Sequence, residues 1–214
     1  MVAYGERLNR NPDWALEEGG RFFVGESEVN AALRRITSRL DELSIPYALV
    51  GGMALFQYGY RRFTEDVHLL VTEEDLKRVH AELEGRGYLP KYPGSRNLRD
   101  TEAGVSIEFL VSGEYPGDGK PKPVKFPEPE NVANLVNGIK CINLAALIEL
   151  KLASGMTTDR LKDLADVQEL ARSLGLDAEF GNQLNPYVQA KFEEIRPRTP
   201  NENSPIEEPY LDRD

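Results

Sequence analysis

Three polar side chains, Asp66, His68 and Glu108, lie in short segments whose apolar–polar alternation is typical of β-strands. Residues i and i+2 of a strand project on the same side, so Asp66 and His68 share one face. Glu108 lies on the polar side of a second such segment. Carboxylate oxygens and imidazole nitrogens bind divalent cations, and such a cation can hold a triphosphate. Each residue alone is better explained as a solvated strand residue, but together on adjacent strands they predict a metal site.

A pair of glycines, Gly51 and Gly52, follows the short apolar segment 47–50 and precedes a helix predicted over 53–60. Glycine lets the backbone approach a phosphate with no Cβ in the way, and free N–H groups at the start of a helix attract anions. A glycine pair in this position is more often a plain tight turn, so phosphate binding depends on the residues around it.

Basic residues near these segments are candidates for binding phosphate. Arg62 precedes the strand that carries Asp66, and it either contacts a phosphate or pairs with Glu65 at the surface. Lys151 lies among leucines on a predicted helix, so its stem can be buried while its ammonium reaches the cleft. Lys162 is spaced i,i+4 from Asp166, which also fits an ordinary helix-surface ion pair.

The elements that must position these residues are readable from periodicity. An apolar stripe at helical spacing predicts a helix from Ser27, with Ser27 as its N-cap. Alternation predicts strands at 65–71 and 104–111, separated by a helix over 73–84. The remaining predicted elements are a Gly- and Pro-rich loop at 113–129, a short strand at 139–142, and helices at 143–154 and 159–174. This order indicates an α+β fold, with a small mixed sheet flanked by helices and a helical C-terminal half.

The length of 214 residues, 40% apolar and 29% charged, fits one main domain. We predict an N-terminal arm at 1–25, the main domain at 26–195 and a polar tail at 196–214. No apolar run is long enough to cross a membrane and the N-terminus resembles no signal peptide, so we expect a cytoplasmic location without membrane binding. The net charge of −10 makes bulk nucleic-acid binding unlikely but permits a nucleotide carried with a divalent cation. The single cysteine, Cys141, is predicted to be a buried small side chain.

A resemblance to a known family lies in residues 49–71, LVGGMALFQYGYRRFTEDVHLLV. This segment resembles the Gly-Gly…Asp-x-Asp signature of the DNA polymerase β-type nucleotidyltransferase superfamily, and in particular its abortive-infection (AbiEii-like) toxin-related branch, which has Arg-x-Thr-x-Asp before the strand. Residues 147–170, LIELKLASGMTTDRLKDLADVQEL, resemble the helix lysine and the Lys-Asp-x-x-Asp element of that branch. The resemblance covers roughly residues 45–172. The positions that match the second block are Lys151, Lys162, Asp163 and Asp166.

The resemblance implies a nucleotidyltransferase (polymerase β palm-like) fold and an enzyme that transfers a nucleoside monophosphate from an NTP to an acceptor, which the sequence does not identify. It implies a divalent cofactor, Mg²⁺ or Mn²⁺, held by Asp66, position 68 and Glu108, with Asp66 and Glu108 catalytic. The substrate-binding residues that it implies are Gly51, Gly52, Arg62, Lys151, Lys162 and Asp163. A toxin–antitoxin-like branch further implies an antitoxin or another protein as a partner.

The sequence departs from the family at position 68, where a histidine replaces a carboxylate. A neutral imidazole is a poor ligand for Mg²⁺ but a good one for Mn²⁺ or Zn²⁺, and one nitrogen cannot bridge two cations. Three hypotheses therefore stay open. They are a nucleotidyltransferase with altered metal use, a catalytically degenerate module that binds a nucleotide or a protein, and a Mn²⁺- or Zn²⁺-dependent phosphohydrolase.

Overall fold

The computed structural model of the chain describes residues 2–157 and 160–198. Its strands form one seven-stranded sheet in the order β3-β4-β5-β2-β1-β7-β6. The strands are β1 (Ala48–Val50), β2 (Asp66–Val71), β3 (Tyr88–Pro90), β4 (Leu98–Asp100), β5 (Ser106–Val111), β6 (Ala133–Val136) and β7 (Ile139–Ile142). The helices are α1 (Tyr4–Arg10), α2 (Pro12–Phe23), α3 (Glu28–Glu42), α4 (Gly51–Gln57), α5 (Glu73–Leu83), α6 (Pro129–Val132), α7 (Leu144–Gly155), α8 (Leu161–Leu174), α9 (Ala178–Gly181) and α10 (Pro186–Ile195).

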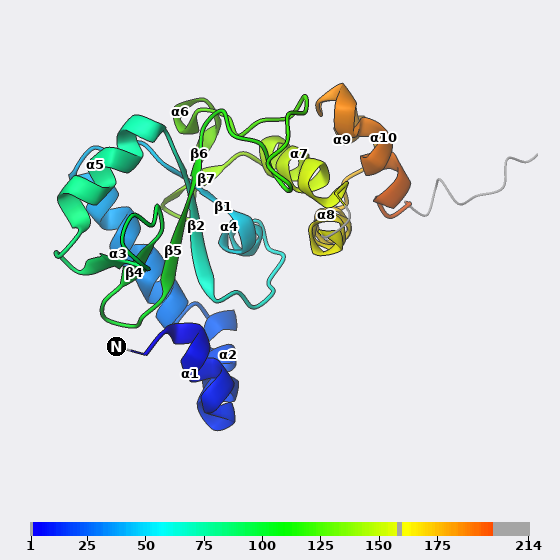
Figure 1. The fold of residues 1–214 in the computed structure, drawn as a ribbon. Coiled ribbons are helices and arrows are strands. Elements are labelled where there is room, and N and C mark those ends of the chain that lie inside the picture. The colour runs from blue at the N-terminus through cyan, green and yellow to red at the C-terminus, as the bar shows by residue number, and fades with distance from the viewer. Residues whose placement is uncertain (1, 158–159, 199–214) are drawn as a thin grey trace, which may run out of the picture.

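The sheet is mixed, as predicted. β2 pairs with β5 in parallel and β1 pairs with β7 in parallel, while the other neighbours are antiparallel. Helices α7 to α10 gather at one end of the molecule, on the side away from α5, so the C-terminal part is helical (Figure 1). The predicted α+β class, with a small mixed sheet flanked by helices, is confirmed.

Local sequence signals account for where the helices begin. The Ser27 side chain accepts the Asn30 backbone N–H, and the Asn30 side chain accepts the Ser27 N–H in return, which makes a capping box at the start of α3. Thr72 and Asn143 cap α5 and α7 in the same way, each accepting the backbone N–H three residues later. Local capping thus fixes the residues at which these three helices begin.

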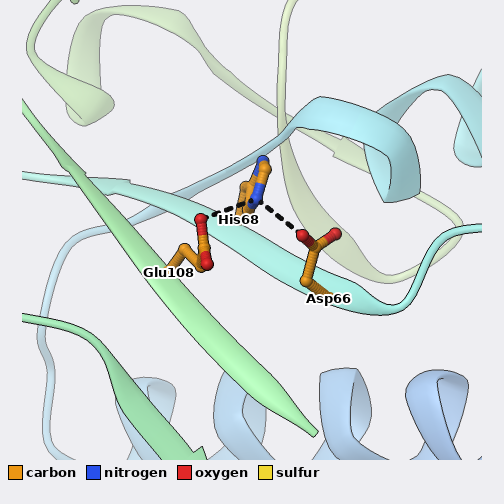
Figure 2. A group of neighbouring side chains, drawn as sticks. All are labelled: Asp66, His68 and Glu108. Carbon is orange, nitrogen blue, oxygen red and sulfur yellow. Dashed lines mark ion pairs between the residues drawn. The ribbon is translucent and has the colours of Figure 1, made fainter. Parts of the chain in front are cut away.

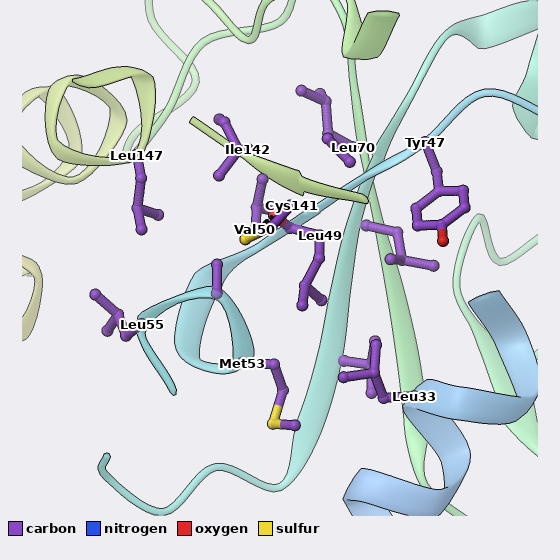
Figure 3. Close-up of a cluster of buried hydrophobic side chains, with 14 of the residues drawn as sticks. Leu33, Tyr47, Leu49, Val50, Met53, Leu55, Leu70, Cys141, Ile142 and Leu147 are labelled. Carbon is purple, nitrogen blue, oxygen red and sulfur yellow. Dashed lines mark hydrogen bonds between the residues drawn. The ribbon is translucent and has the colours of Figure 1, made fainter. Parts of the chain in front are cut away.

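The core lies between the sheet and its nearest helices. Figure 3 shows Leu33 of α3, Leu49 of β1, Met53 of α4 and Leu147 of α7 in one cluster of buried side chains, all at most 2% exposed. Cys141 of β7 is in the same cluster and fully buried, and its burial raises the pKa of its thiol to about 12. The prediction of a buried, unreactive cysteine fits this environment.

The N-terminal segment differs from the predicted arm, because it folds into helices α1 and α2. Pro12 occupies the first turn of α2, and the Asn11 side chain accepts the Trp14 N–H, so the helix start follows ordinary capping chemistry. Tyr4 and Phe22 are almost fully buried, which makes this segment part of the core. The predicted tail lies outside the described residues from position 199 onward. Among the described helices, none has the length and apolarity that crossing a membrane requires.

Candidate metal centre

The two central parallel strands bring the three predicted metal ligands together. In the register of β2 and β5, His68 lies beside Glu108, and Asp66 lies one pleat away on the same face. Figure 2 shows the three side chains pointing toward one another from the two strands. One potential ligand atom from each residue lies within 4.8 Å of the other two. The predicted convergence of Asp66, His68 and Glu108 is therefore what the fold produces.

The histidine lies between the two carboxylates. Its Nε2 is 3.2 Å from Asp66 Oδ2 and 3.2 Å from Glu108 Oε2. Nε2 is a buried atom, and these two carboxylate oxygens are its ion-pair partners, although neither contact has the geometry of a well-formed hydrogen bond. Neighbouring ligands of an octahedral cation with bonds of about 2.1 Å are about 3.0 Å apart. A buried imidazole nitrogen that faces two carboxylate oxygens at this spacing fits a divalent cation in place of the proton that it shares with them.

The charges of the three side chains are strongly coupled. Burial opposes protonation of His68, but the two carboxylates outweigh it and raise the pKa of the imidazole to about 9. Burial also opposes ionisation of Asp66, yet His68 and Thr64 lower the pKa of this carboxyl to about 2. His68 and then Lys91 lower the pKa of Glu108 to about 2 as well. Without a cation, a proton on His68 stabilises both carboxylates, and a bound cation must displace that proton.

In each carboxylate, one oxygen faces His68 and the other accepts a hydrogen bond from a neighbouring side chain. Asp66 Oδ1 accepts the Thr64 hydroxyl at 2.7 Å. Glu108 Oε1 accepts the Lys91 ammonium at 2.7 Å and, more distantly, the Ser106 hydroxyl at 3.4 Å. Sequence reasoning missed Lys91, because it follows a three-residue strand in a polar stretch with no motif of its own.

The glycine pair is required by the close approach of α4 to β2. Gly51 has a φ of +68°, and a Cβ there would lie 2.6 Å from His68 Nδ1. A Cβ on Gly52 would lie 3.0 Å from the Thr64 side chain. Both glycines thus let the start of the helix pack against the ligand-bearing strand. A role in phosphate binding stays a prediction.

All of the predicted site residues line one cleft of about 360 Å³. The three candidate metal ligands form one wall of the cleft, and its other walls come from α7, from the start of α8 and from Pro116 and Gly117 of the loop predicted at 113–129. Its members from the predicted set are Gly51, Gly52, Arg62, Asp66, His68, Glu108, Lys151, Lys162 and Asp163. Residues far apart in the chain are therefore gathered on one concave surface.

A buried ion-pair network forms one wall of this cleft and differs from two surface ion pairs that the sequence left open as alternatives. The Arg62 guanidinium donates two hydrogen bonds to Asp166, at 2.5 and 2.8 Å, rather than pairing with Glu65. The Lys151 ammonium donates to the same Asp166 at 2.7 Å and to Asp163 at 2.8 Å. Asp166 is 1% exposed, because this face of α8 packs on α7, so it does not form the predicted surface pair with Lys162.

Two further cations lie on the cleft wall, and the charge of one of them, Arg160, helps to lower the pKa of Asp163. Lys162 and Arg160 are exposed and line the cleft, and within residues 2–157 and 160–198 neither forms an ion pair. By contrast, the positive charges of Arg62 and Lys151 are balanced by the negative charges of Asp163 and Asp166. Lys162 was predicted from the family resemblance, whereas Arg160 was missed because it has no distinctive spacing.

The comparisons with known proteins give a fold likeness. No protein-family model and no curated protein sequence matches the chain. The solution structure of the antibiotic-resistance factor ANT(2'')-Ia is 16% identical at a TM-score of 0.50, covering 75% of this chain and 89% of that one. The crystal structure of ANT(2'')-Ia in complex with adenylyl-2''-tobramycin is 15% identical at a TM-score of 0.50, covering 77% and 96%. An antigenic nucleotidyltransferase-like protein from Paracoccidioides brasiliensis is 14% identical at a TM-score of 0.40, covering 80% and 94%. The likeness to ANT(2'')-Ia shows that this chain has the fold of nucleotidyltransferases.

Proposed function

We propose that this chain, with its nucleotidyltransferase fold, is a metal-dependent enzyme that transfers a nucleoside monophosphate from an NTP to a hydroxyl group of an acceptor. The observation that carries the proposal is the convergence of Asp66 Oδ2, His68 Nε2 and Glu108 Oε2 at the side of one cleft. The resemblance of residues 49–71 and 147–170 to the abortive-infection-related branch supports the same activity. ANT(2'')-Ia has been seen in complex with adenylyl-2''-tobramycin, a small molecule that bears an adenylyl group. This complex supports transfer of the nucleotidyl group to a small-molecule acceptor.

The chemistry divides among named residues. Asp66, His68 and Glu108 would hold the divalent cation, which supplies a positive charge that lowers the pKa of the attacking hydroxyl and stabilises the charge on the phosphates. The hydroxyl oxygen bonds to the α-phosphorus, the bond from that phosphorus to the β-phosphate oxygen breaks, and pyrophosphate leaves. The hydroxyl proton passes to water, because Asp66 and Glu108 would hold the cation and have pKa values of about 2. The donor set of two oxygens and one nitrogen favours Mn²⁺ over Mg²⁺.

The cleft wall would hold the phosphates and the nucleoside. Lys162 and Arg160 offer two exposed cations that form no ion pair within the described residues, and Gly51 and Gly52 line the cleft beside them. Lys151 and Arg62 are not free to bind a phosphate directly, because they already donate hydrogen bonds to Asp163 and Asp166. They shape a rigid wall with little net charge.

The proposal is tested by titrating a non-hydrolysable NTP analogue into the protein with Mn²⁺, with Mg²⁺ and with EDTA. We expect binding that needs a divalent cation and is tighter with Mn²⁺, and we expect its loss in Asp66→Asn without a change in the circular dichroism spectrum. Binding that is equally tight in EDTA would contradict the proposal and favour a nucleotide-binding module. With an α-labelled NTP, label that appears only as free monophosphate would favour a phosphohydrolase.

A further inference from the structure

The two outer oxygens of the metal centre are already held by the protein. Thr64 donates to Asp66 Oδ1 at 2.7 Å, and Lys91 donates to Glu108 Oε1 at 2.7 Å. Only Asp66 Oδ2, His68 Nε2 and Glu108 Oε2 face one another, so three ligand atoms surround one position. A second cation would need an outer carboxylate oxygen or a ligand at position 68 that bridges two ions, and an imidazole nitrogen cannot bridge.

The charge of the centre leads to the same conclusion. Asp66 and Glu108 each carry one negative charge, while the Lys91 ammonium adds one positive charge in direct contact with Glu108. With neutral His68, one divalent cation already makes the cluster net positive. A second divalent cation would add repulsion, with no further carboxylate at the centre to offset it.

Lys91 is held in place by backbone contacts. Its N–H donates to the Asn97 carbonyl at 3.3 Å, and Asn97 Oδ1 accepts the Phe109 N–H at 3.0 Å. Phe109 follows Glu108 in β5, so the segment carrying Lys91 is tied to the strand that carries its partner. The Lys91 side chain is only 29% exposed, and Lys91 does not line the cleft. Its ammonium contacts Oε1 of Glu108, the carboxylate oxygen that does not face His68.

We infer that this centre binds a single divalent cation, and that Lys91 is a positioning residue whose ammonium occupies the Glu108 oxygen that a second cation would need. The inference rests on the proposed function, since it concerns the metal of the same site. It assigns to Lys91 a role that the family resemblance does not include. It also explains how a histidine is accommodated at position 68, because a mononuclear site needs no bridging ligand there.

The test counts Mn²⁺ ions bound per chain, by isothermal titration calorimetry and by equilibrium dialysis with metal analysis, in four proteins. They are the wild type, His68→Asp, Lys91→Met, and the double variant. We expect one ion in the wild type and in His68→Asp, and two in the double variant, where three carboxylates are present and the ammonium is gone. We expect Lys91→Met alone to bind one ion at least about tenfold more tightly, because a positive charge beside the ligand is removed.

The matched control is Lys77→Met combined with His68→Asp, because Lys77 pairs with Glu73 on the exposed surface of α5 and should not change the count. Two ions in the wild type or in His68→Asp would overturn the inference, as would one ion in the double variant. Absence of Mn²⁺ binding in every protein would overturn the proposed function itself, so the two failures are distinguishable. Lys91→Gln is a second variant if Lys91→Met does not fold, as judged by circular dichroism.

Discussion

Replacing Lys151 by methionine perturbs the buried network on the cleft wall while keeping the aliphatic stem. The Lys151 side chain is 8% exposed, and its ammonium contacts Asp163 at 2.8 Å and Asp166 at 2.7 Å. Removing one partner of a buried ion pair typically costs about 3–5 kcal/mol, because a charge is left uncompensated. Here Asp166 keeps two hydrogen bonds from Arg62, and Asp163 keeps one from Ser154 at 2.7 Å. We therefore expect a loss of about 2–4 kcal/mol in the free energy of unfolding.

The assay is equilibrium denaturation together with the thermal midpoint. A loss of this size should lower the midpoint by roughly 4–16 °C for a domain of this size. A cycle with Asp163→Asn measures the pair directly, and we expect a coupling energy of at least about 1 kcal/mol. The control is Lys77→Met, an exposed pair with Glu73 at 3.1 Å, which should change stability by less than about 0.5 kcal/mol.

A loss below about 1 kcal/mol in Lys151→Met would refute this reasoning, since it would mean that the network adds no net stability after desolvation. That result would return Lys151 to the role implied by the resemblance, a cation kept available for phosphate. Nucleotide affinity measured on the same variant then gives the size of that role.

Three further outcomes follow from the site. His68→Asp should bind Mg²⁺ more tightly than the wild type, because it restores a hard anionic ligand; equal or weaker binding by calorimetry would contradict the ligand assignment. His68 has a folded pKa of about 9 against an ordinary 6.5, so in EDTA its stabilisation should be complete below pH 6.5 and lost as the pH rises through 9. Denaturant unfolding from pH 6 to 10 checks this, and His68→Asn should lack that alkaline loss. Lys162→Met should weaken NTP binding roughly three- to tenfold at an unchanged thermal midpoint, and unchanged affinity would remove Lys162 from the site.

The elements that carry the metal ligands could be predicted because their signals are local. Alternation at 65–71 and 104–111 predicts both strands, and each strand is long enough for the polar face to be distinguished from the core face. The stripe that begins at Val29 and the cap at Ser27 predict α3 for the same reason. The glycine pair at the junction of β1 and α4 was also recognisable, because the φ of +68° at Gly51 favours glycine.

Elements that depend on distant partners were missed. Strands β3 and β4 have three residues each and are stabilised by pairing with each other and with β5, which no short pattern reveals. The contact of Arg62 with Asp166 joins positions 104 residues apart, so it was not among the two alternatives that the sequence offered, a phosphate or the near neighbour Glu65. Helix α2 lies within the segment predicted as an arm, although the Asn11–Pro12 start signal is present in the sequence.

The central claim is that Asp66, His68 and Glu108 hold a divalent cation that positions an NTP in the cleft. The most direct measurement is a crystal structure with Mn²⁺ and a non-hydrolysable NTP, using anomalous scattering at the manganese edge. We predict one anomalous peak in contact with Asp66 Oδ2, His68 Nε2 and Glu108 Oε2, with the triphosphate beside Gly51. A nucleotide bound elsewhere, or a cleft with nucleotide and no peak at these three atoms, would contradict the claim.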